Sequence, residues 1–299
     1  MKLRRWILIA TVAAAFIGSY ALKRKFVPGP EAAAPPPAGA SRIVSLAPSI
    51  TEILFELGLG DRVVGVTRYC LYPPEAKTKT QIGGYYDPNF EAVQATKPEL
   101  VIVLPEHVEI RSQIEKLGVH TLIVDHTHIQ GILDSVTAIG AACGAPDRAK
   151  SLRGRLEARI AAVQAKVGSR PRPRVLISIG RMAGDASMSR ISICGRKGIF
   201  EELINLAGGL NAFEGPVAFP SVSAEGVLAS NADVIVDLWP DLKEKNIAPE
   251  TVRRQWKTVP GLKSRIEVIG ESYAMIPGPR VVLLLEDLAR AFHPEAIHD

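Results

Sequence analysis

The hydrophobic pattern is most regular between Pro146 and Gly168. Pro146 and Asp147 suit the first turn of a helix, and Gly168 suits its end. At roughly 1.5 Å per residue such a helix extends about 33 Å, which is long for a connection between two strands. We therefore predict a strut between two lobes, with a long surface helix in one domain as the alternative. Apolar residues recur along it at steps of three and four, which mark one helical face, at Ala149, Leu152, Leu156, Ile160, Val163 and Val167.

Before the strut, short apolar runs alternate with helical patterns. Predicted strands cover residues 42–48, 63–66, 100–104 and 121–124, and predicted helices end at Leu57 and Leu117, begin near Phe90 and span 129–142. Ser49 or Thr51 is the expected cap of the first helix. Strands that alternate with helices indicate a parallel sheet covered on both faces.

The same scheme returns after the strut. Predicted strands cover 174–179, 234–237 and 266–269, and predicted helices cover 198–206 and 281–292. The expected fold class is α/β, with two lobes that contain parallel-type sheets flanked by helices and are joined by one long connecting helix. The lobes comprise residues 42–128 and 169–299, and the connecting helices comprise residues 129–168.

Two glutamates occupy matching places in the two lobes. Glu91 lies ten residues before Val101, and Glu225 lies ten residues before Ile235, each in the first turn of a short helix before a buried strand. The matched spacing predicts a docking pair that meets two equivalent basic patches on a symmetric partner. The alternative is that each carboxylate only complements the dipole of its own helix.

The N-terminus predicts export. Residues 6–22 form an apolar run behind a basic stretch, so we interpret residues 1–25 as a signal peptide or a membrane anchor. Residues 26–41 are rich in proline and alanine and read as a tether. The folded part is therefore expected in the periplasm or another extracytoplasmic space, held to the membrane if the segment is uncleaved. Much of the net charge of +5 lies in this region, which argues against a nucleic-acid partner.

Aromatic residues concentrate in the predicted loops beyond the strands, where ligands bind in α/β sheets. Rigid aromatic side chains there suit a flat, partly apolar ligand held between two lobes. The alternative is that some of them only cover the sheets. The residues concerned are Tyr69, Tyr72, Tyr85 and Tyr86 in the first lobe and Phe219, Trp239 and Tyr273 in the second.

Catalytic and metal sites are not indicated. The sequence contains neither a Gly-x-Ser-x-Gly elbow nor a phosphate-binding loop, so we expect no catalytic residues. Strand-end histidines suit a transition metal, but matching ligands in the second lobe are lacking, so we expect no metal site. Outside the cytoplasm the three cysteines allow one disulfide or three buried thiols. These histidines are His107, His126 and His128, and the cysteines are Cys70, Cys143 and Cys194.

Several segments together resemble the periplasmic cobalamin- and ferric-siderophore-binding proteins of ABC importers, a family of helical-backbone substrate-binding proteins. The resemblance spans about residues 42–292. It is carried by segments 42–52, 64–66, 72–75, 83–84, 89–91 and 97–102 of the first lobe and 202–211, 219–220 and 222–225 of the second.

The resemblance implies a monomeric receptor without enzymatic activity. It implies that cobalamin or a related corrinoid binds in an inter-lobe cleft and is delivered to an ABC permease dimer with its ATPase. It implies little closure, because the strut resists hinging. Glu91 and Glu225 match the family's two glutamates that meet permease arginines. The ligand itself brings cobalt or iron, so the protein needs no cofactor.

The resemblance also implies ligand contacts. In cobalamin-binding members the aromatic contacts fall at or near Tyr69 or Tyr72, Tyr85, Phe219 and Tyr273. Haem-binding relatives use an axial tyrosine, here Tyr85 or Tyr86, so a haem or ferric-siderophore receptor is the first alternative. Basic candidates for such a ligand are Arg68, Arg181 and Arg280. Further alternatives are an exported α/β enzyme that uses the same cleft and a tethered sensor without an importer.

Overall fold

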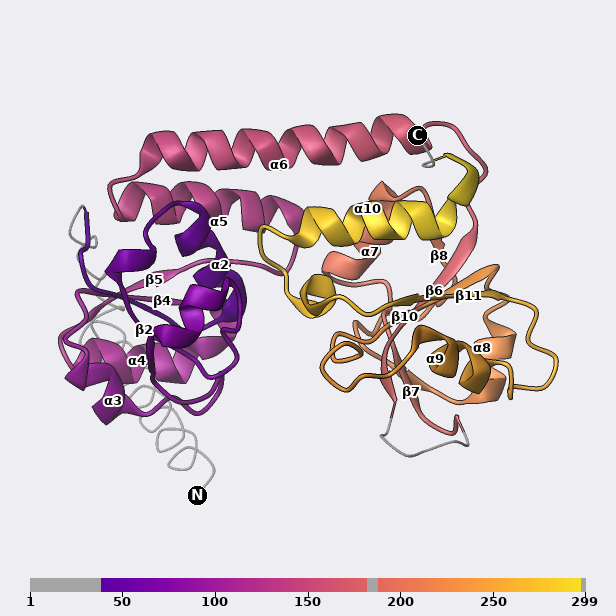
Figure 1. Cartoon of the computed structure of the whole chain (residues 1–299), viewed down its shortest axis with the longest axis horizontal. Helices are drawn as coiled ribbons and strands as arrows, with labels where there is room; N and C mark the ends of the chain where they lie inside the picture. Colours follow the sequence, from indigo (N-terminus) through magenta and orange to yellow (C-terminus); the bar gives the residue numbers. More distant parts are fainter. Residues whose placement is uncertain (1–38, 182–187, 297–299) are drawn as a thin grey trace, which may run out of the picture. The chain divides into compact units, whose positions relative to one another are not determined.

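The computed structural model describes residues 39–181 and 188–296, and residues Pro36–Asp299 belong to one compact unit. The predicted signal or anchor and nearly all of the tether lie outside the described residues, as does the side chain of Arg181. Within the described ranges, no helix combines the length and apolar character needed to cross a membrane. The compact unit consists of two lobes that are joined along one long helix, α6 (Pro146–Val167) (Figure 1).

The first lobe contains a five-stranded, wholly parallel sheet in the order β3-β2-β1-β4-β5. The central strands β1 and β4 are fully buried, as expected for a sheet covered on both faces. The strands are β1 (Ile43–Ser45), β2 (Val63–Val66), β3 (Thr80–Gln81), β4 (Leu100–Val103) and β5 (His120–Ile123). The helices are α2 (Pro48–Glu56), α3 (Phe90–Ala95) and α4 (Val108–Lys116), with 3-10 turns at Gly60–Arg62, Pro74–Thr78 and Pro105–His107.

The predicted cap of α2 was wrong. Ala47 occupies the cap position without a side-chain hydrogen bond, and Pro48 opens the helix. Proline suits this position because its fixed φ is helical and it has no N–H to satisfy. Ser49 and Thr51 instead lie inside the helix with buried side chains, and the Thr51 hydroxyl donates a 2.8 Å hydrogen bond to Ser45 Oγ.

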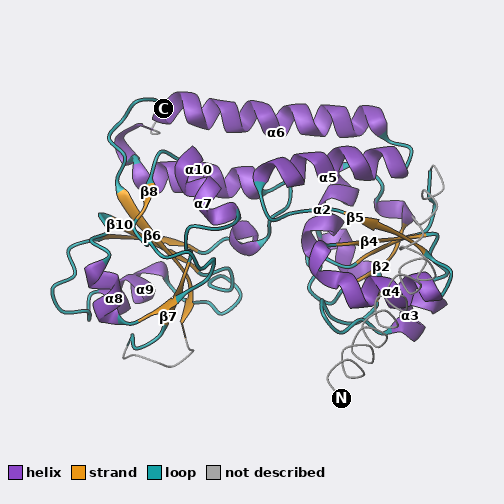
Figure 2. Cartoon of the chain, turned by 180° about the vertical axis from the view of Figure 1, so that it is seen from behind, coloured by secondary structure: helices purple, strands orange, loops and turns teal. Residues whose placement is uncertain are grey.

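The connection between the lobes consists of α5 (Ile129–Ala142) and α6 (Pro146–Val167). The six apolar residues of the predicted stripe are the buried residues of α6, which confirms the strut. Gly168 ends it with a φ of +48°, a conformation that glycine adopts without steric cost. Helix α6 packs against α5 and against the C-terminal helix α10 (Val281–Phe292), and both views show α5 and α10 lying along it (Figure 2).

The second lobe contains a mixed sheet in the order β11-β10-β6-β7-β9, with β8 beside β6. Strands β6, β10 and β11 are parallel as predicted, whereas β7 runs antiparallel to β6, and β9 antiparallel to β7. Nine residues separate β6 from β7, too few for the crossover that a parallel pair needs. The strands are β6 (Arg174–Arg181), β7 (Ile191–Ile193), β8 (Leu210–Asn211), β9 (Ser221–Val222), β10 (Val234–Leu238) and β11 (Arg265–Ile269).

The remaining helices of this lobe surround the mixed sheet. Helices α7 and α8 begin close to the positions that the sequence predicts, whereas α9 was not predicted. Val252 and Trp256 are the buried residues of α9, one turn apart. The elements are α7 (Ile199–Leu206), α8 (Ala224–Ala229) and α9 (Pro249–Trp256), with 3-10 turns at Ser272–Met275 and Pro294–Ala296.

One hydrophobic core runs through both lobes and the connection. It includes Leu54 of α2, Leu156 of α6, Phe200 of α7 and Leu288 of α10. A smaller cluster around Trp256 lies in the second lobe, and another lies in the first. The lobes are therefore held against each other by shared apolar packing around α5, α6 and α10.

Candidate functional site

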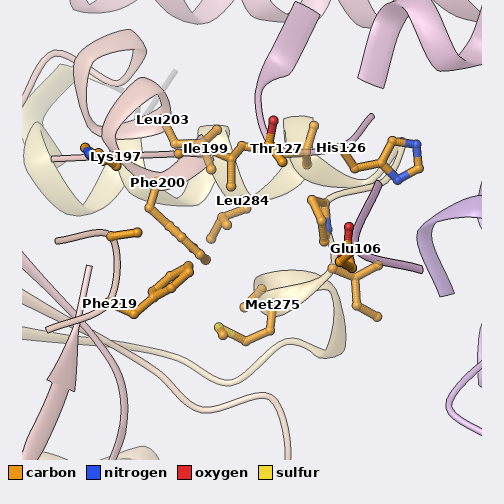
Figure 3. A pocket seen from close by; sticks show the side chains of 16 residues that line it. Glu106, His126, Thr127, Lys197, Ile199, Phe200, Leu203, Phe219, Met275 and Leu284 are labelled. Carbon is orange, nitrogen blue, oxygen red and sulfur yellow. The ribbon is translucent and has the colours of Figure 1, made fainter. Parts of the chain in front are cut away.

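A cavity of about 370 Å³ lies between the two lobes (Figure 3). The first lobe contributes Glu106 and His126, which follow strands β4 and β5. The second lobe contributes Phe200 and Phe219, and the segment before α10 contributes Met275. The cavity thus lies at the carboxyl ends of the strands, as predicted for a ligand site in an α/β fold.

A second cavity of about 280 Å³ adjoins the first and belongs mainly to the first lobe. Tyr69 and Tyr85 line it together with Ser49. Met275, Ile276 and Pro277 line both cavities. The two cavities therefore flank one segment of chain, and together they form an inter-lobe cleft with aromatic rings in both lobes.

The structure brings three of the predicted ligand-binding aromatics to this cleft. Tyr69 and Tyr85 line one cavity and Phe219 lines the other. Phe219 stands edge-on to Phe200, with ring centroids 6.3 Å apart. Sequence reasoning missed Phe200, because it considered aromatic residues in loops and Phe200 lies in helix α7.

Tyr85, which lines the smaller cavity, belongs to a cluster of three rings. Its ring lies 4.7 Å from that of Tyr86 and 4.6 Å from that of His107, and Tyr86 is 71% exposed. The Tyr85 hydroxyl donates a hydrogen bond to Glu106 Oε1. Burial, reinforced by the Glu106 carboxylate, raises the pKa of Tyr85 well above its ordinary value, so Tyr85 is a neutral phenol at pH 7. His107 Nδ1 accepts a hydrogen bond from the Leu104 N–H at 3.2 Å.

Arg280 and two predicted tyrosines form a separate cluster that joins the lobes. The Arg280 guanidinium lies 3.8 Å from the centre of the Tyr72 ring and 5.6 Å from that of Tyr273. It also donates to Glu52 Oε1 at 2.6 Å, and the two side chains are 10% and 1% exposed. The Tyr273 hydroxyl donates to Asp287 Oδ2 at 2.6 Å. Tyr72, Tyr273 and Arg280 line neither of the two cavities described above.

Trp239 lies elsewhere in the second lobe. It is half-buried and packs against the cluster that contains Trp256 and Leu242. The Trp256 indole, in turn, donates a 2.8 Å hydrogen bond to Asp237 Oδ2, near the carboxyl end of strand β10. Trp239 therefore covers this lobe's own sheet and lines neither cavity.

The strand-end histidines contact neighbouring polar groups. His126 Nδ1 lies 2.8 Å from Ser49 Oγ, and burial lowers the pKa of His126 to about 4. His128 Nδ1 lies 3.4 Å from Asp125 Oδ2. In the part of the chain that the structure describes, no group of three or more His, Cys, Asp or Glu side chains is arranged to hold a metal ion.

The three cysteines are buried free thiols. The alternative of three small buried thiols is thus the one observed. Burial raises the pKa of Cys143 to about 11, and it raises the pKa of Cys70 and Cys194 as well. Thiols that are buried and protonated at neutral pH are poor nucleophiles and poor metal ligands.

The predicted docking glutamates belong to two copies of one local structure. Glu91 of α3 and Glu225 of α8 are exposed second residues of six-residue helices. Asn89 caps α3 by accepting from the Ala92 N–H at 2.9 Å, and Ser223 caps α8 in the same way. At the other ends, the Thr96 and Ser230 hydroxyls donate to Val93 O and Val227 O.

The match extends into the sheets. Ile43 of β1 pairs with Leu100, and Val175 of β6 pairs with Val234, so each short helix leads into the equivalent strand in the same register. An arginine before each pair holds the C-terminal end of the helix: Arg42 donates to Lys97 O, and Arg174 to Ser230 O, both at 3.0 Å. Both α3 and α8 lie on the side of their lobes away from α6 (Figure 1).

Comparison with known proteins agrees with the geometry. Residues 43–271 match the family model described as periplasmic binding protein. The vitamin B12-binding protein of Salmonella choleraesuis is 27% identical over 255 residues, which cover 84% of this chain and 90% of that protein. The uncharacterized ABC transporter substrate-binding lipoprotein YvrC of Bacillus subtilis is 27% identical over 264 residues, which cover 86% and 82% of the two chains.

Solved structures show the same two-lobed fold. The periplasmic heme-binding protein RhuT from Roseiflexus sp. RS-1 is 31% identical, with a TM-score of 0.70 over 86% of this chain and 100% of that chain. The periplasmic vitamin B12 binding protein BtuF of Vibrio cholerae is 23% identical, with a TM-score of 0.71 over 86% and 98% of the two chains. The chain therefore belongs to the periplasmic binding protein family, the extracytoplasmic components that bind a small molecule for the permease and ATPase of an ABC importer.

Proposed function

We propose that this binding protein carries cobalamin or a related corrinoid in its inter-lobe cleft and performs no covalent chemistry. The observation that carries the proposal is the placement of aromatic rings in both lobes around a largely apolar cleft. Tyr69 and Phe219 are 51% and 56% exposed, so both rings have surface to offer to a flat macrocycle. The curated vitamin B12-binding relatives support this ligand class.

Haem is the second candidate, because the heme-binding RhuT is 31% identical to this chain. A tyrosine that ligates haem iron binds as a phenolate. The raised pKa of Tyr85 and its hydrogen bond to Glu106 oppose that state, since they favour the neutral phenol. In a haem complex the exposed Tyr86 is therefore the better axial ligand, and Tyr85 serves better as a neutral ring against a corrinoid.

The test is calorimetric titration of the protein with cyanocobalamin, hemin and ferric siderophores. We expect one-to-one binding of cyanocobalamin, weakened about tenfold by Tyr85→Ala or Phe219→Ala, because buried aromatic contacts contribute on the order of 1–2 kcal/mol. Trp239→Phe is the control, since Trp239 lines neither cavity. Hemin binding that depends on Tyr86, without cobalamin binding, transfers the proposal to haem. Binding of none of these ligands favours the enzyme alternative.

We also propose that Glu91 and Glu225 dock the loaded protein onto the permease dimer. The two carboxylates are exposed, and the same local structure holds each of them. Two equivalent anionic points suit two equivalent basic patches on a symmetric partner. We expect the double variant Glu91→Arg, Glu225→Arg to abolish uptake and to leave the ligand affinity unchanged.

The docking test measures uptake of labelled ligand by cells that contain the cognate permease and ATPase, alongside the affinity of each purified variant. The matched control is Glu109→Arg with Glu250→Arg. These two acids lie in the first turns of α4 and α9, one in each lobe, and are also exposed. Equal loss of uptake in both double variants, or loss of ligand affinity in the first, contradicts the docking role.

A further inference from the structure

Glu106 has a special position in the cleft that the sequence did not reveal. It lies in the 3-10 turn Pro105–His107, directly after β4, and it lines the larger cavity. Tyr85, whose hydroxyl donates to Glu106 Oε1, lines the smaller cavity. Figure 3 shows Glu106 on the first-lobe side of the cavity, opposite Phe200 and Phe219. The Tyr85–Glu106 pair therefore stands where the two cavities meet.

The charges around the cleft are few. Among the described residues that line these two cavities, the charged side chains are Glu106, which is acidic, and Lys197, which is basic. His126 also lines the larger cavity, and its lowered pKa keeps it neutral at pH 7. Tyr85 engages Glu106 Oε1 and fixes the direction of the carboxylate. The second oxygen, Oε2, has the chemistry of an acceptor for a ligand N–H group.

We propose that Glu106, oriented by Tyr85, determines specificity by accepting a hydrogen bond from a peripheral amide of the ligand and by repelling a peripheral carboxylate. This inference rests on the proposed corrinoid function. The rim of cobalamin carries neutral amides, which donate N–H groups, whereas the rim of haem carries two carboxylates. A fixed carboxylate in the cleft favours the first macrocycle and penalises the second, since specificity combines attraction with repulsion.

The experiment compares three probes on the full-length protein: cyanocobalamin, the carboxylate derivatives obtained by hydrolysing its peripheral amides, and hemin. In Glu106→Gln the side chain keeps its size and an acceptor for Tyr85 but loses its charge. We expect this variant to bind cyanocobalamin about threefold to tenfold more weakly and to bind the carboxylate derivatives more tightly. The control is Glu109→Gln, an exposed acid three residues on that lines neither cavity.

A second variant tests the role of Tyr85. Tyr85→Phe keeps the ring and removes only the hydroxyl. We therefore expect it to lose part of the preference for cyanocobalamin over the carboxylate derivatives, as Glu106→Gln does. In the double variant the two effects should not add, because both act through one carboxylate. Additive effects would show that Tyr85 does not orient Glu106.

The outcomes separate this inference from the function on which it rests. If the wild type binds cyanocobalamin and Glu106→Gln leaves the ratio of amide to carboxylate affinities unchanged, the specificity role is overturned and the corrinoid function stands. If the wild type binds hemin or carboxylate derivatives and not cyanocobalamin, both are overturned, since a carboxylate ligand is then accepted beside Glu106.

Discussion

The ion pair between Glu52 and Arg280 is the residue-scale contact with the largest expected effect on stability. It links α2 of the first lobe to the start of α10, and both side chains are almost completely buried. Burial raises the pKa of Glu52, and the hydrogen bond and charge of Arg280 oppose that rise. A buried carboxylate is tolerated only where a partner compensates its lost hydration.

Arg280→Met is therefore expected to lower the free energy of unfolding by about 3–5 kcal/mol at pH 7, because it leaves the Glu52 carboxylate buried without its partner. The measurement is urea unfolding followed by circular dichroism. Without Arg280 the groups that lower the pKa of Glu52 are gone, so burial raises this pKa further in the variant than in the wild type. The loss should therefore shrink as the pH falls through the folded-state pKa of Glu52 in the variant and the carboxyl takes up a proton. The control is Arg68→Met, which removes the exposed ion pair with Asp87 and should cost less than about 1 kcal/mol. Similar losses in the two variants contradict this account.

His126 gives a second prediction, on pH dependence. Its ordinary pKa of 6.5 falls to about 4 in the folded protein, because burial disfavours the charged ring. The unfolded chain therefore binds the proton more readily, so the stability contribution is complete above pH 6.5 and is lost as the pH falls toward 4. The difference is about 3 kcal/mol. Unfolding of wild type and His126→Gln at several pH values tests this, and an equal pH dependence of the two proteins contradicts it.

A residue of the site could be predicted where its position follows from the local sequence, and could not where it depends on a partner distant in the sequence. The position of Tyr69, Tyr85 and Phe219 at the cleft was predictable, because loops beyond apolar strands can be located from the local sequence. Glu52 and Glu106 were not, because their importance comes from contacts with Arg280 and Tyr85, which lie 228 and 21 positions away. An isolated acidic residue gives no local sign of such a partner.

At the scale of elements, α6 offers a direct test of how its face packs. Gly154 lies on the exposed side of this helix, and a Cβ atom there meets open space. Gly154→Ala should therefore stabilise the protein by about 0.5–1 kcal/mol, through helix propensity and a less flexible unfolded chain. Gly140 of α5 is the opposite case, since its Cβ would lie 2.3 Å from Ala149 Cβ of α6. Gly140→Ala should destabilise the protein. Thermal unfolding of both variants measures this, with a higher melting temperature expected for Gly154→Ala and a lower one for Gly140→Ala. A stabilising Gly140→Ala contradicts the close packing of α5 on α6.

The elements that were predicted have a local pattern, and those that were missed do not. The apolar stripe of α6 runs from Ala149 to Val167 of a 22-residue helix, so its period is unambiguous. Strands β7 and β9 have three and two residues, too few to show any period, and their antiparallel pairing depends on a neighbour that the sequence does not identify. Helix α9 buries only Val252 and Trp256, so its apolar face is too narrow to stand out.

At the scale of the whole folded unit, the two lobes share one core. Apolar residues of α2, α5, α6, α7 and α10 form a single cluster. The ion pair between Arg159 of α6 and Glu286 of α10, at 2.8 Å, adds a polar contact between two helices of this cluster. An opening motion of the lobes would have to expose part of this cluster to water, at about 25 cal/mol per Å². This shared core gives a physical reason for the limited closure that the family resemblance implies.

A shared core also predicts that the lobes unfold together. Trp239 and Trp256 both lie in the second lobe, so in a Trp6→Phe background tryptophan fluorescence follows that lobe alone, whereas far-ultraviolet circular dichroism follows the helices of both. We expect the two signals to give one urea midpoint, because neither lobe keeps its apolar face covered without the other. Leu156→Ala, which removes a buried side chain of α6 from the shared core, should lower both midpoints together. The expected loss in the free energy of unfolding is about 2–5 kcal/mol. Saturating ligand should raise both together, since it binds only the joined lobes. If the circular dichroism falls in two steps and fluorescence follows only one of them, the lobes are independent, and the rigidity of the cleft must then come from the ligand instead of the core.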